Sequence, residues 1–321
     1  MATFATDGRS PLEELTARRR WTDRLMTVVI YASFVVAMIP LLWLATTVIQ
    51  RGLVRFNLRA DGTTGFNLEF LTTSMRGVFG GMPAGGIQAA IVGTLLITLA
   101  ATVISVPIGM LTAIYIVEYG HGWLKRAVTF FVDVMTGIPS IVAGLFAYAL
   151  FYVVVGPGTK TGIVGAIALS VLMIPVVVRA SEEMLRLVPN ELREASYALG
   201  VPKWLTVLKV VVRTAFAGLT TGVMLAVARV IGETAPLLVA VGVNDSVNAN
   251  VFNGRMMSLP VYIVNEWGKN VQTCRASVAG CQPDIAIMRA WAAALVLILI
   301  VMALNLVARL IARYLSPKTG R

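Results

Sequence analysis

Six long apolar segments constrain this chain more than any other feature. Each has about the 20 residues that a helix needs to cross the roughly 30 Å hydrocarbon layer of a membrane. Hydrophobic residues make up 57% of the chain and charged residues only 13%, against roughly 25% charged residues in soluble domains. The sequence therefore predicts an all-α, polytopic helical membrane protein with six transmembrane helices. We expect these at about 25–49, 86–116, 127–155, 162–180, 214–241 and 287–312.

Basic residues are distributed unevenly between the connections, which indicates the orientation. Sixteen lie in the two terminal segments and in the second and fourth connections, whereas nine lie in the alternate connections. Cytoplasmic loops carry the excess of Lys and Arg, so both termini are expected in the cytoplasm. The nine residues expected outside are Arg51, Arg55, Arg59, Arg76, Lys160, Arg255, Lys269, Arg275 and Arg289.

The first 24 residues are expected to lie on the cytoplasmic surface as an amphipathic segment, with Leu12, Leu15 and Trp21 as apolar contacts. Residues 25–321 are then expected to form the transmembrane domain. The net charge of +11 is spread over loop ends rather than gathered on one face. This pattern favours anchoring to membrane lipid and argues against nucleic acid as a partner.

One sustained polar segment, at about 181–213, is expected to form a cytoplasmic loop with a short helix. Pro189 suits the start of a helix, and Glu194 lies near the positive N-terminal end. Gly200 followed by Pro202 predicts a stop after about 11 residues. Such an element has no core of its own. It is either a surface for a partner or a hairpin that merely joins two spans.

Two further charged positions lie inside or at the end of apolar segments. Arg229 and Glu233 are four residues apart, which places them on the same helical face of the fifth span. A centred arginine costs about 2.5–3.5 kcal/mol and normally faces a cavity or a partner. The pair is either an ion pair that locks the bundle or an anion site, in which the planar fork of arginine binds an oxyanion.

Asp133 lies in the third span and Arg179 at the end of the fourth. The two side chains are expected to pair as part of a gate, although a polar helix contact without a transport role and a snorkelling Arg179 fit equally well. Thr136 and Ser140 flank Pro139, which interrupts the helix. Their hydroxyls are candidates for lining a pore or for stabilising the kink.

Cys274 and Cys281 both fall in the last external loop, where either a disulfide or two free thiols are consistent with the compartment. His121 is the single histidine, so no metal site is expected. No P-loop and no arrangement of nucleophile, histidine and acid is present. The chain is therefore expected not to be an enzyme, and the energy for any transport must come from another subunit.

The polar loop resembles the EAA loop of the MetI-like permeases of ABC importers. Glu194, Ala195 and Gly200 match its first half, with Ser196 in place of the second alanine. The second half fits more loosely, because Arg213 stands where the family has proline. Two further stretches resemble the A subunit of the phosphate (Pst) branch of this family. They are G-I-P-S-I-V-A-G-L-F at 137–146 and A-R-V-I-G-E-T-A-P-L-L at 228–238.

This resemblance implies a type I ABC importer permease fold in a bacterial inner membrane, and phosphate uptake by alternating access. Glu194, Ala195 and Gly200 would belong to a helix that couples the permease to an ATPase, while Arg229 and Arg179 would be linked to phosphate movement. The implied partners are a second, C-type permease subunit, two ATPase subunits that hold ATP and Mg, and an external phosphate-binding protein. No cofactor is expected in this chain itself.

Two other functions are compatible with the residues alone. One is a permease for another oxyanion, such as sulfate or molybdate. The other is a self-contained anion channel or ion-coupled exchanger, which would need no docking helix and would often show internal repeats.

Overall fold

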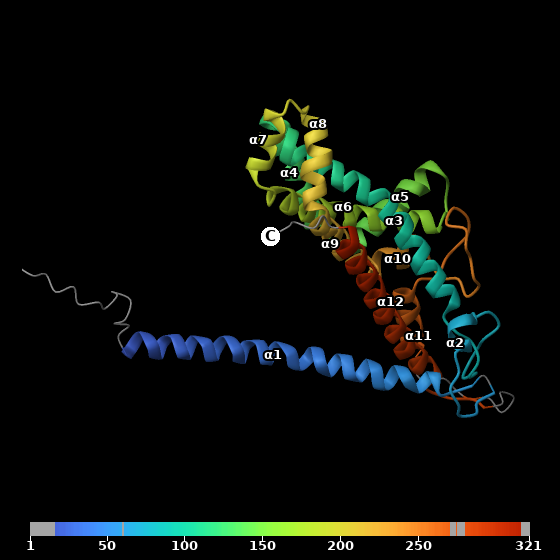
Figure 1. Ribbon diagram of the computed structural model, residues 1–321. Helices are drawn as coiled ribbons and strands as arrows, with labels where there is room; N and C mark the ends of the chain where they lie inside the picture. Colours follow the sequence, from blue (N-terminus) through green and yellow to red (C-terminus); the bar gives the residue numbers. More distant parts are fainter. Residues whose placement is uncertain (1–16, 60, 270–273, 275–279, 316–321) are drawn as a thin grey trace, which may run out of the picture. The chain divides into compact units, whose positions relative to one another are not determined.

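The computed structural model describes residues 17–59, 61–269, 274 and 280–315 (Figure 1). Within them, regular structure is helical apart from one isolated β-bridge between Leu58 and Thr64. The chain divides into two compact units, Met1–Gln50 and Arg51–Arg321. The helical elements, of which η1 and η2 are π-helical, are α1 (Ala17–Phe56), α2 (Glu69–Thr72), α3 (Gln88–Ile114), η1 (Tyr115–Tyr119), α4 (Gly122–Thr136), α5 (Ser140–Val154), α6 (Gly162–Arg186), α7 (Asn190–Ala198), α8 (Lys203–Thr206), η2 (Val207–Val211), α9 (Val212–Val230), α10 (Ala235–Ala240), α11 (Leu259–Gly268) and α12 (Ile285–Leu315).

Five continuous helical stretches of the described residues are long and apolar enough to cross a membrane, and one bent helix pair supplies a sixth. The prediction of an all-α protein with several spans is confirmed. The expected surface segment 1–24 lies mostly outside the described residues, and α1 is already helical from Ala17. The five continuous stretches are Trp21–Phe56, Gln88–Tyr119, Gly162–Arg186, Lys203–Val230 and Ile285–Tyr314.

The third span, expected as one helix at 127–155, is instead the pair α4 and α5, which meet at an angle of 106°. Pro139 lies directly before α5 with an extended backbone, at φ −57° and ψ 134°. It has no N–H to continue the hydrogen-bond ladder of α4, so the chain turns there. Hydropathy did not predict the bend, because the residues on both sides of Pro139 are apolar whether or not the helix axis changes direction there.

The fifth span is shifted relative to the expected 214–241, because it runs from Lys203 to Val230. Helix α9 ends at Val230, and a separate short helix, α10, begins at Ala235. Pro236 lies in the first turn of α10, where its missing N–H has no intrahelical partner to lose. The apolar run therefore contains a break that hydropathy alone did not reveal.

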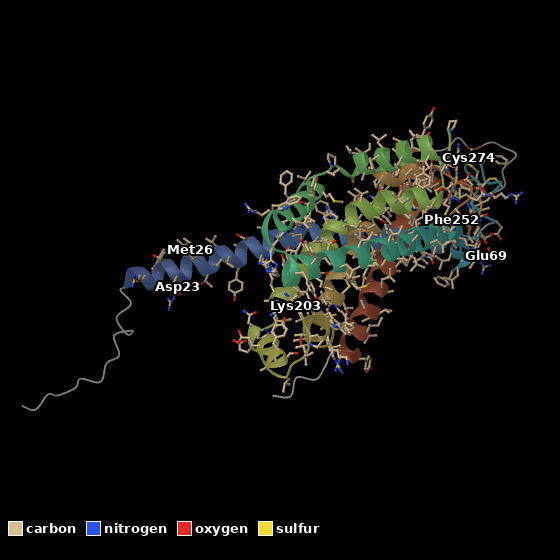
Figure 2. All side chains as sticks on the ribbon, turned by 90° about the horizontal axis from the view of Figure 1, so that it is seen from above. Asp23, Met26, Glu69, Lys203, Phe252 and Cys274 are labelled. Atoms are coloured by element: carbon tan, nitrogen blue, oxygen red, sulfur yellow. A yellow bond between two sulfur atoms is a disulfide. The ribbon has the colours of Figure 1, made fainter. Side chains whose placement is uncertain are left out.

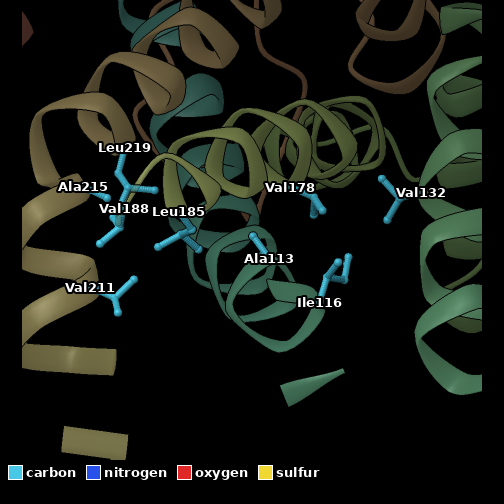
Figure 3. Close-up of a cluster of buried hydrophobic side chains, with 9 residues drawn as sticks. All are labelled: Ala113, Ile116, Val132, Val178, Leu185, Val188, Val211, Ala215 and Leu219. Atoms are coloured by element: carbon cyan, nitrogen blue, oxygen red, sulfur yellow. The ribbon is translucent and has the colours of Figure 1, made fainter. Parts of the chain in front are cut away.

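A cluster of buried side chains joins several helices near α7 (Figure 3). It brings together the end of α3, η1, α4, the second half of α6, η2 and the start of α9. The short connection between α6 and α7 contributes as well. The cluster consists of Ala113, Ile116, Val132, Val178, Leu185, Val188, Val211, Ala215 and Leu219. The two π-helical segments are thus packed into the same core.

At the α2 end of the second unit, two arginines are buried rather than exposed. Arg55 and Arg289 have only 1% and 2% of their surface accessible. The Arg55 guanidinium donates to the carbonyl oxygens of Leu58 at 2.7 Å and Pro83 at 2.8 Å. Arg289 donates to Ala84 O at 2.6 Å and pairs with Glu266 at 3.3 Å. Counting both as loop charges was wrong, because both side chains are buried and hydrogen-bonded.

Tyr262, on α11, is buried beside this group, with 1% of its surface accessible. Burial raises the pKa of its phenol well above the ordinary value, and the nearby Glu266 carboxylate raises that pKa further. Tyr262 therefore stays protonated at neutral pH. The charges of the cluster come from the two arginines and from Glu266, which Lys269 also contacts.

Candidate functional site

Helix α7 has the ends that the sequence predicts. Pro189 directly precedes it with an extended backbone, and Gly200 follows it at φ +76°. The Gly200 N–H donates to Tyr197 O at 2.9 Å, and the Val201 N–H donates to Ser196 O at 3.2 Å. These two bonds form a Schellman motif, whose left-handed residue favours glycine. The observed helix has nine residues, against about 11 expected.

One face of α7 and its flanks is exposed and partly apolar. Glu191, Glu194 and Ala195 are exposed on the helix itself. Leu199 is 83% exposed and Leu187 is 73% exposed. Exposed apolar side chains beside exposed charged ones are a feature of partner surfaces. The exposed large apolar residues of this region are Leu187, Leu192, Tyr197, Leu199, Trp204 and Leu208.

The opposite face of α7 is attached to the rest of the bundle through Arg193 and Ser196, which are three residues apart. Arg193 forms a salt bridge of 2.9 Å with Glu118 in η1. The hydroxyl groups of Ser196 and Thr206 are 2.8 Å apart and buried. Both attachments were missed from the sequence. Glu118 is 75 residues from Arg193 and carries no local signal of its partner.

A chain of ion pairs connects α4 with α6. Arg179 pairs with Asp133, as expected, and also with Glu182 at 2.7 Å. Glu182 in turn pairs with Arg186 at 2.7 Å. The Glu182 carboxylate is only 7% exposed, so it holds two arginines in a largely buried position. Sequence reasoning missed Glu182, although its spacing of three and four residues from the two arginines is a helix-pair signal.

Thr136 and Ser140 lie on opposite sides of the bend. The Thr136 hydroxyl donates to Asp133 O at 2.6 Å, which satisfies a carbonyl in the last turn of α4. This is the kink-stabilising arrangement. Ser140 is half-buried at the first position of α5.

Arg229 and Glu233 do not share a helical face, so that expectation was wrong. Arg229 is exposed in the last turn of α9, and Glu233 follows in the turn, where its N–H donates to Val230 O at 3.1 Å. Within the part of the chain that the structure describes, no ion pair links Arg229 to Glu233. The break after Val230 separates the two side chains. A locking ion pair between them is therefore absent from this conformation.

The two sequence stretches 137–146 and 228–238 meet in space. Helix α5 packs against α10. A β-carbon built on Gly144 would lie 2.5 Å from the Pro236 Cα, so only glycine fits at this crossing. The stretch that contains Arg229 is thus held next to the stretch that follows the bend.

The far end of the second unit carries the disulfide. Cys274 and Cys281 form a disulfide, with their Cα atoms 5.8 Å apart, so of the two alternatives the structure has the bonded one. In Figure 2, Cys274 and Phe252 lie at the end of the bundle opposite Lys203. Figure 1 shows the same separation, with α7 and α8 at one end and α2 at the other. The polar loop and the disulfide loop therefore lie at opposite ends of the spans.

A bundle of apolar spans with a short helix held at one end is the architecture of a multi-pass membrane protein. Residues 105–321 match the family described as the binding-protein-dependent transport system inner membrane component. The chain belongs to this family. It is thus a multi-pass permease component, and ATP hydrolysis takes place on separate subunits.

The sequence similarity to relatives of known name covers nearly the whole chain. A phosphate transport system permease protein PstA 1 of Mycobacterium tuberculosis is 46% identical over 96% of this chain and 92% of the relative. The phosphate transport system permease protein PstA of Yersinia pestis is 34% identical over 92% and 91%.

The fold also matches solved structures. A chain of the MetNI methionine ABC transporter in inward-facing conformations has a TM-score of 0.53 at 20% identity. The match covers 78% of this chain and 99% of that chain. At this identity the likeness concerns the fold, which is that of an ABC importer permease.

Proposed function

We propose that this chain is the permease subunit of an ATP-driven importer of inorganic phosphate. The observation that carries the proposal is the match to phosphate permeases over more than nine tenths of both chains, at 34–46% identity. The exposed guanidinium of Arg229 supports it, because arginine binds phosphate oxygens through two parallel hydrogen bonds. Arg229 also lies in one of the stretches that resemble the phosphate branch.

The α7 end faces the cytoplasm in this proposal, as do both termini, in agreement with the distribution of basic residues. Two ATPase subunits dock on the exposed face of α7, where Glu194, Ala195 and Gly200 lie. A homologous C-type permease forms the other half of the pore. An external phosphate-binding protein docks on the side that carries the disulfide.

Transport then proceeds by alternating access. Closure of the ATPase pair on ATP moves α7, and the spans rock around a central site. Arg229 is the anion ligand in this site, and Glu233 lies in the adjoining turn. The Asp133–Arg179 pair lies nearer to α7, where it serves as part of a gate. A point charge such as lysine would replace the fork of Arg229 only in part.

Uptake of radiolabelled phosphate into proteoliposomes tests the proposal directly. The chain is reconstituted with its partner permease, the phosphate-binding protein and either the active ATPase or no ATPase. We expect ATP-dependent uptake only with the ATPase, and little competition by sulfate or molybdate. Uptake without ATPase would indicate a channel or exchanger. Stronger transport of sulfate or molybdate would instead indicate a permease for another oxyanion.

A further inference from the structure

The Arg193 side chain is unusual in that all five of its N–H donors have acceptors. Nε and Nη2 donate to Glu118 Oε1 at 3.1 and 2.9 Å. Nη2 also donates to Leu185 O at 3.0 Å. Nη1 donates to Val188 O at 2.5 Å and to Asn190 Oδ1 at 3.1 Å. One guanidinium therefore joins α7, η1 and the end of α6.

This junction is largely shielded from water. The Arg193 side chain is 13% exposed and the Glu118 side chain is 6% exposed. A partner that docks on the exposed face of α7 meets Glu191, Glu194 and Ala195, whereas Arg193 points away from that face. Arg193 thus attaches α7 to the bundle through the face of the helix opposite the exposed one.

The second attachment of α7 is also buried and also involves a π-helical segment. Ser196 contacts Thr206, which directly precedes the π-helical segment η2, while Arg193 contacts Glu118 inside the π-helical segment η1. Short π-helical turns inside longer helices are rare and often occur at functional sites. Each continues into a span, because η1 follows α3 and η2 precedes α9. The two attachments of α7 therefore lie next to the ends of two spans.

We propose that Arg193 is a positioning residue that couples α7 to the spans: through Glu118 it transmits the displacement of α7 into α3. This inference rests on the proposed function, since it assumes that an ATPase moves α7. Lysine can replace Arg193 only in part, because a single ammonium cannot reach acceptors on three elements at once. Ser196 and Thr206 form the weaker, uncharged attachment to α9.

The test uses the complete transporter in proteoliposomes, with its partner permease, ATPase and phosphate-binding protein. Phosphate uptake and ATP hydrolysis are measured in the same vesicles for Arg193→Gln, Arg193→Lys and Glu118→Gln. The double variant Arg193→Gln, Glu118→Gln removes both buried charges together. Arg313→Gln is the matched control, since Arg313 is an exposed arginine on α12. Co-purification of the ATPase reports whether docking is intact.

We expect both glutamine variants to retain the ATPase and to hydrolyse ATP, while the phosphate taken up per ATP falls at least tenfold. Arg193→Lys should retain only part of the normal ratio of phosphate taken up to ATP hydrolysed. The control Arg313→Gln should have the same ratio as the unmodified transporter. The double variant should stay uncoupled, because a purely structural ion pair would be rescued by removing both charges. If Arg193→Gln fails to insert, Glu118→Gln gives the answer alone.

A normal ratio of phosphate to ATP in Glu118→Gln would overturn the inference. So would rescue by the double variant, or loss of the ATPase from Arg193→Gln, which would place Arg193 in the docking surface itself. Failure of the proposed function is distinguishable from all of these. In that case the unmodified transporter would already show no ATP-dependent phosphate uptake.

Discussion

Gly144 on α5 and Pro236 on α10 touch backbone to backbone. A β-carbon at Gly144 would lie 2.5 Å from the Pro236 Cα and 2.8 Å from its carbonyl oxygen. Contacts of this kind let membrane helices approach closely without side chains between them. The position of α10, and of the turn that follows Arg229, is thereby fixed by the helix beyond the bend.

Gly144→Val should therefore push α5 and α10 apart. Overpacking of this type costs about 1–3 kcal/mol, so we expect a lower thermal unfolding temperature and reduced phosphate uptake. Gly268→Val is the matched control, because nothing lies within 4 Å of a β-carbon at Gly268. Thermal unfolding of the two purified variants in detergent gives the comparison. Equal stability of both would show that the crossing tolerates a side chain.

Gly200→Val should impair coupling. A β-branched residue at φ +76° is strained, and the left-handed conformation costs about 1–2 kcal/mol for residues with a β-carbon. Insertion should be unaffected, because a β-carbon at Gly200 meets nothing within 4 Å. Gly200→Asn, which tolerates this conformation, should retain most of the uptake. Full uptake by Gly200→Val at matched expression would contradict the docking role of α7.

Arg229→Gln should abolish phosphate uptake while the protein remains inserted and bound to its ATPase. Arg229→Lys should restore only part, because its ammonium lacks the bidentate geometry. Adding Glu233→Gln to Arg229→Gln should not rescue transport, since the structure shows no ion pair between the two side chains whose loss must be relieved. Uptake of labelled phosphate by the single and double variants is the measurement. Recovery in the double variant would mean that the two charges do pair during transport.

The disulfide should stabilise its own loop. Cys274 and Cys281 are seven residues apart, which in the chain-entropy model corresponds to about 2–3 kcal/mol. Cys274→Ser, Cys281→Ser should make the loop more sensitive to limited proteolysis without affecting ATPase docking at the opposite end. Intact mass after alkylation without reductant tests the bond itself. Two alkylated thiols in the unmodified protein would show that it does not form.

The sequence predicted the elements that are determined by residues close together in the chain. Apolar runs of sufficient length predicted the spans, and Pro189 with Gly200 predicted both ends of α7. The bend between α4 and α5 and the break between α9 and α10 could not be predicted in this way. Hydropathy stays high through Pro139 and through the break before Ala235, so one bent pair and one interrupted helix were each interpreted as a single span.

Contacts between distant residues were also beyond the sequence. Arg55 and Arg289 look like ordinary loop charges, yet both are buried because backbone carbonyls from another segment accept their hydrogen bonds. Arg193 lies within the motif that was singled out, but its partner Glu118 is on a different span. Asp133 and Arg179 do pair, whereas Glu182, the second partner of Arg179, was missed.

The buried Arg289 has a consequence for the making of the protein. It lies on the last helix, while the carbonyl groups of Met82 and Ala84 that it holds are 207 and 205 residues earlier. At about 5–20 residues per second, roughly 10–40 s of synthesis separate these acceptors from their donor. Until α12 has been synthesised, the carbonyl groups of Met82 and Ala84 lack the Arg289 donor. The hydrogen bonds at the α2 end can therefore be completed only after the last helix is made.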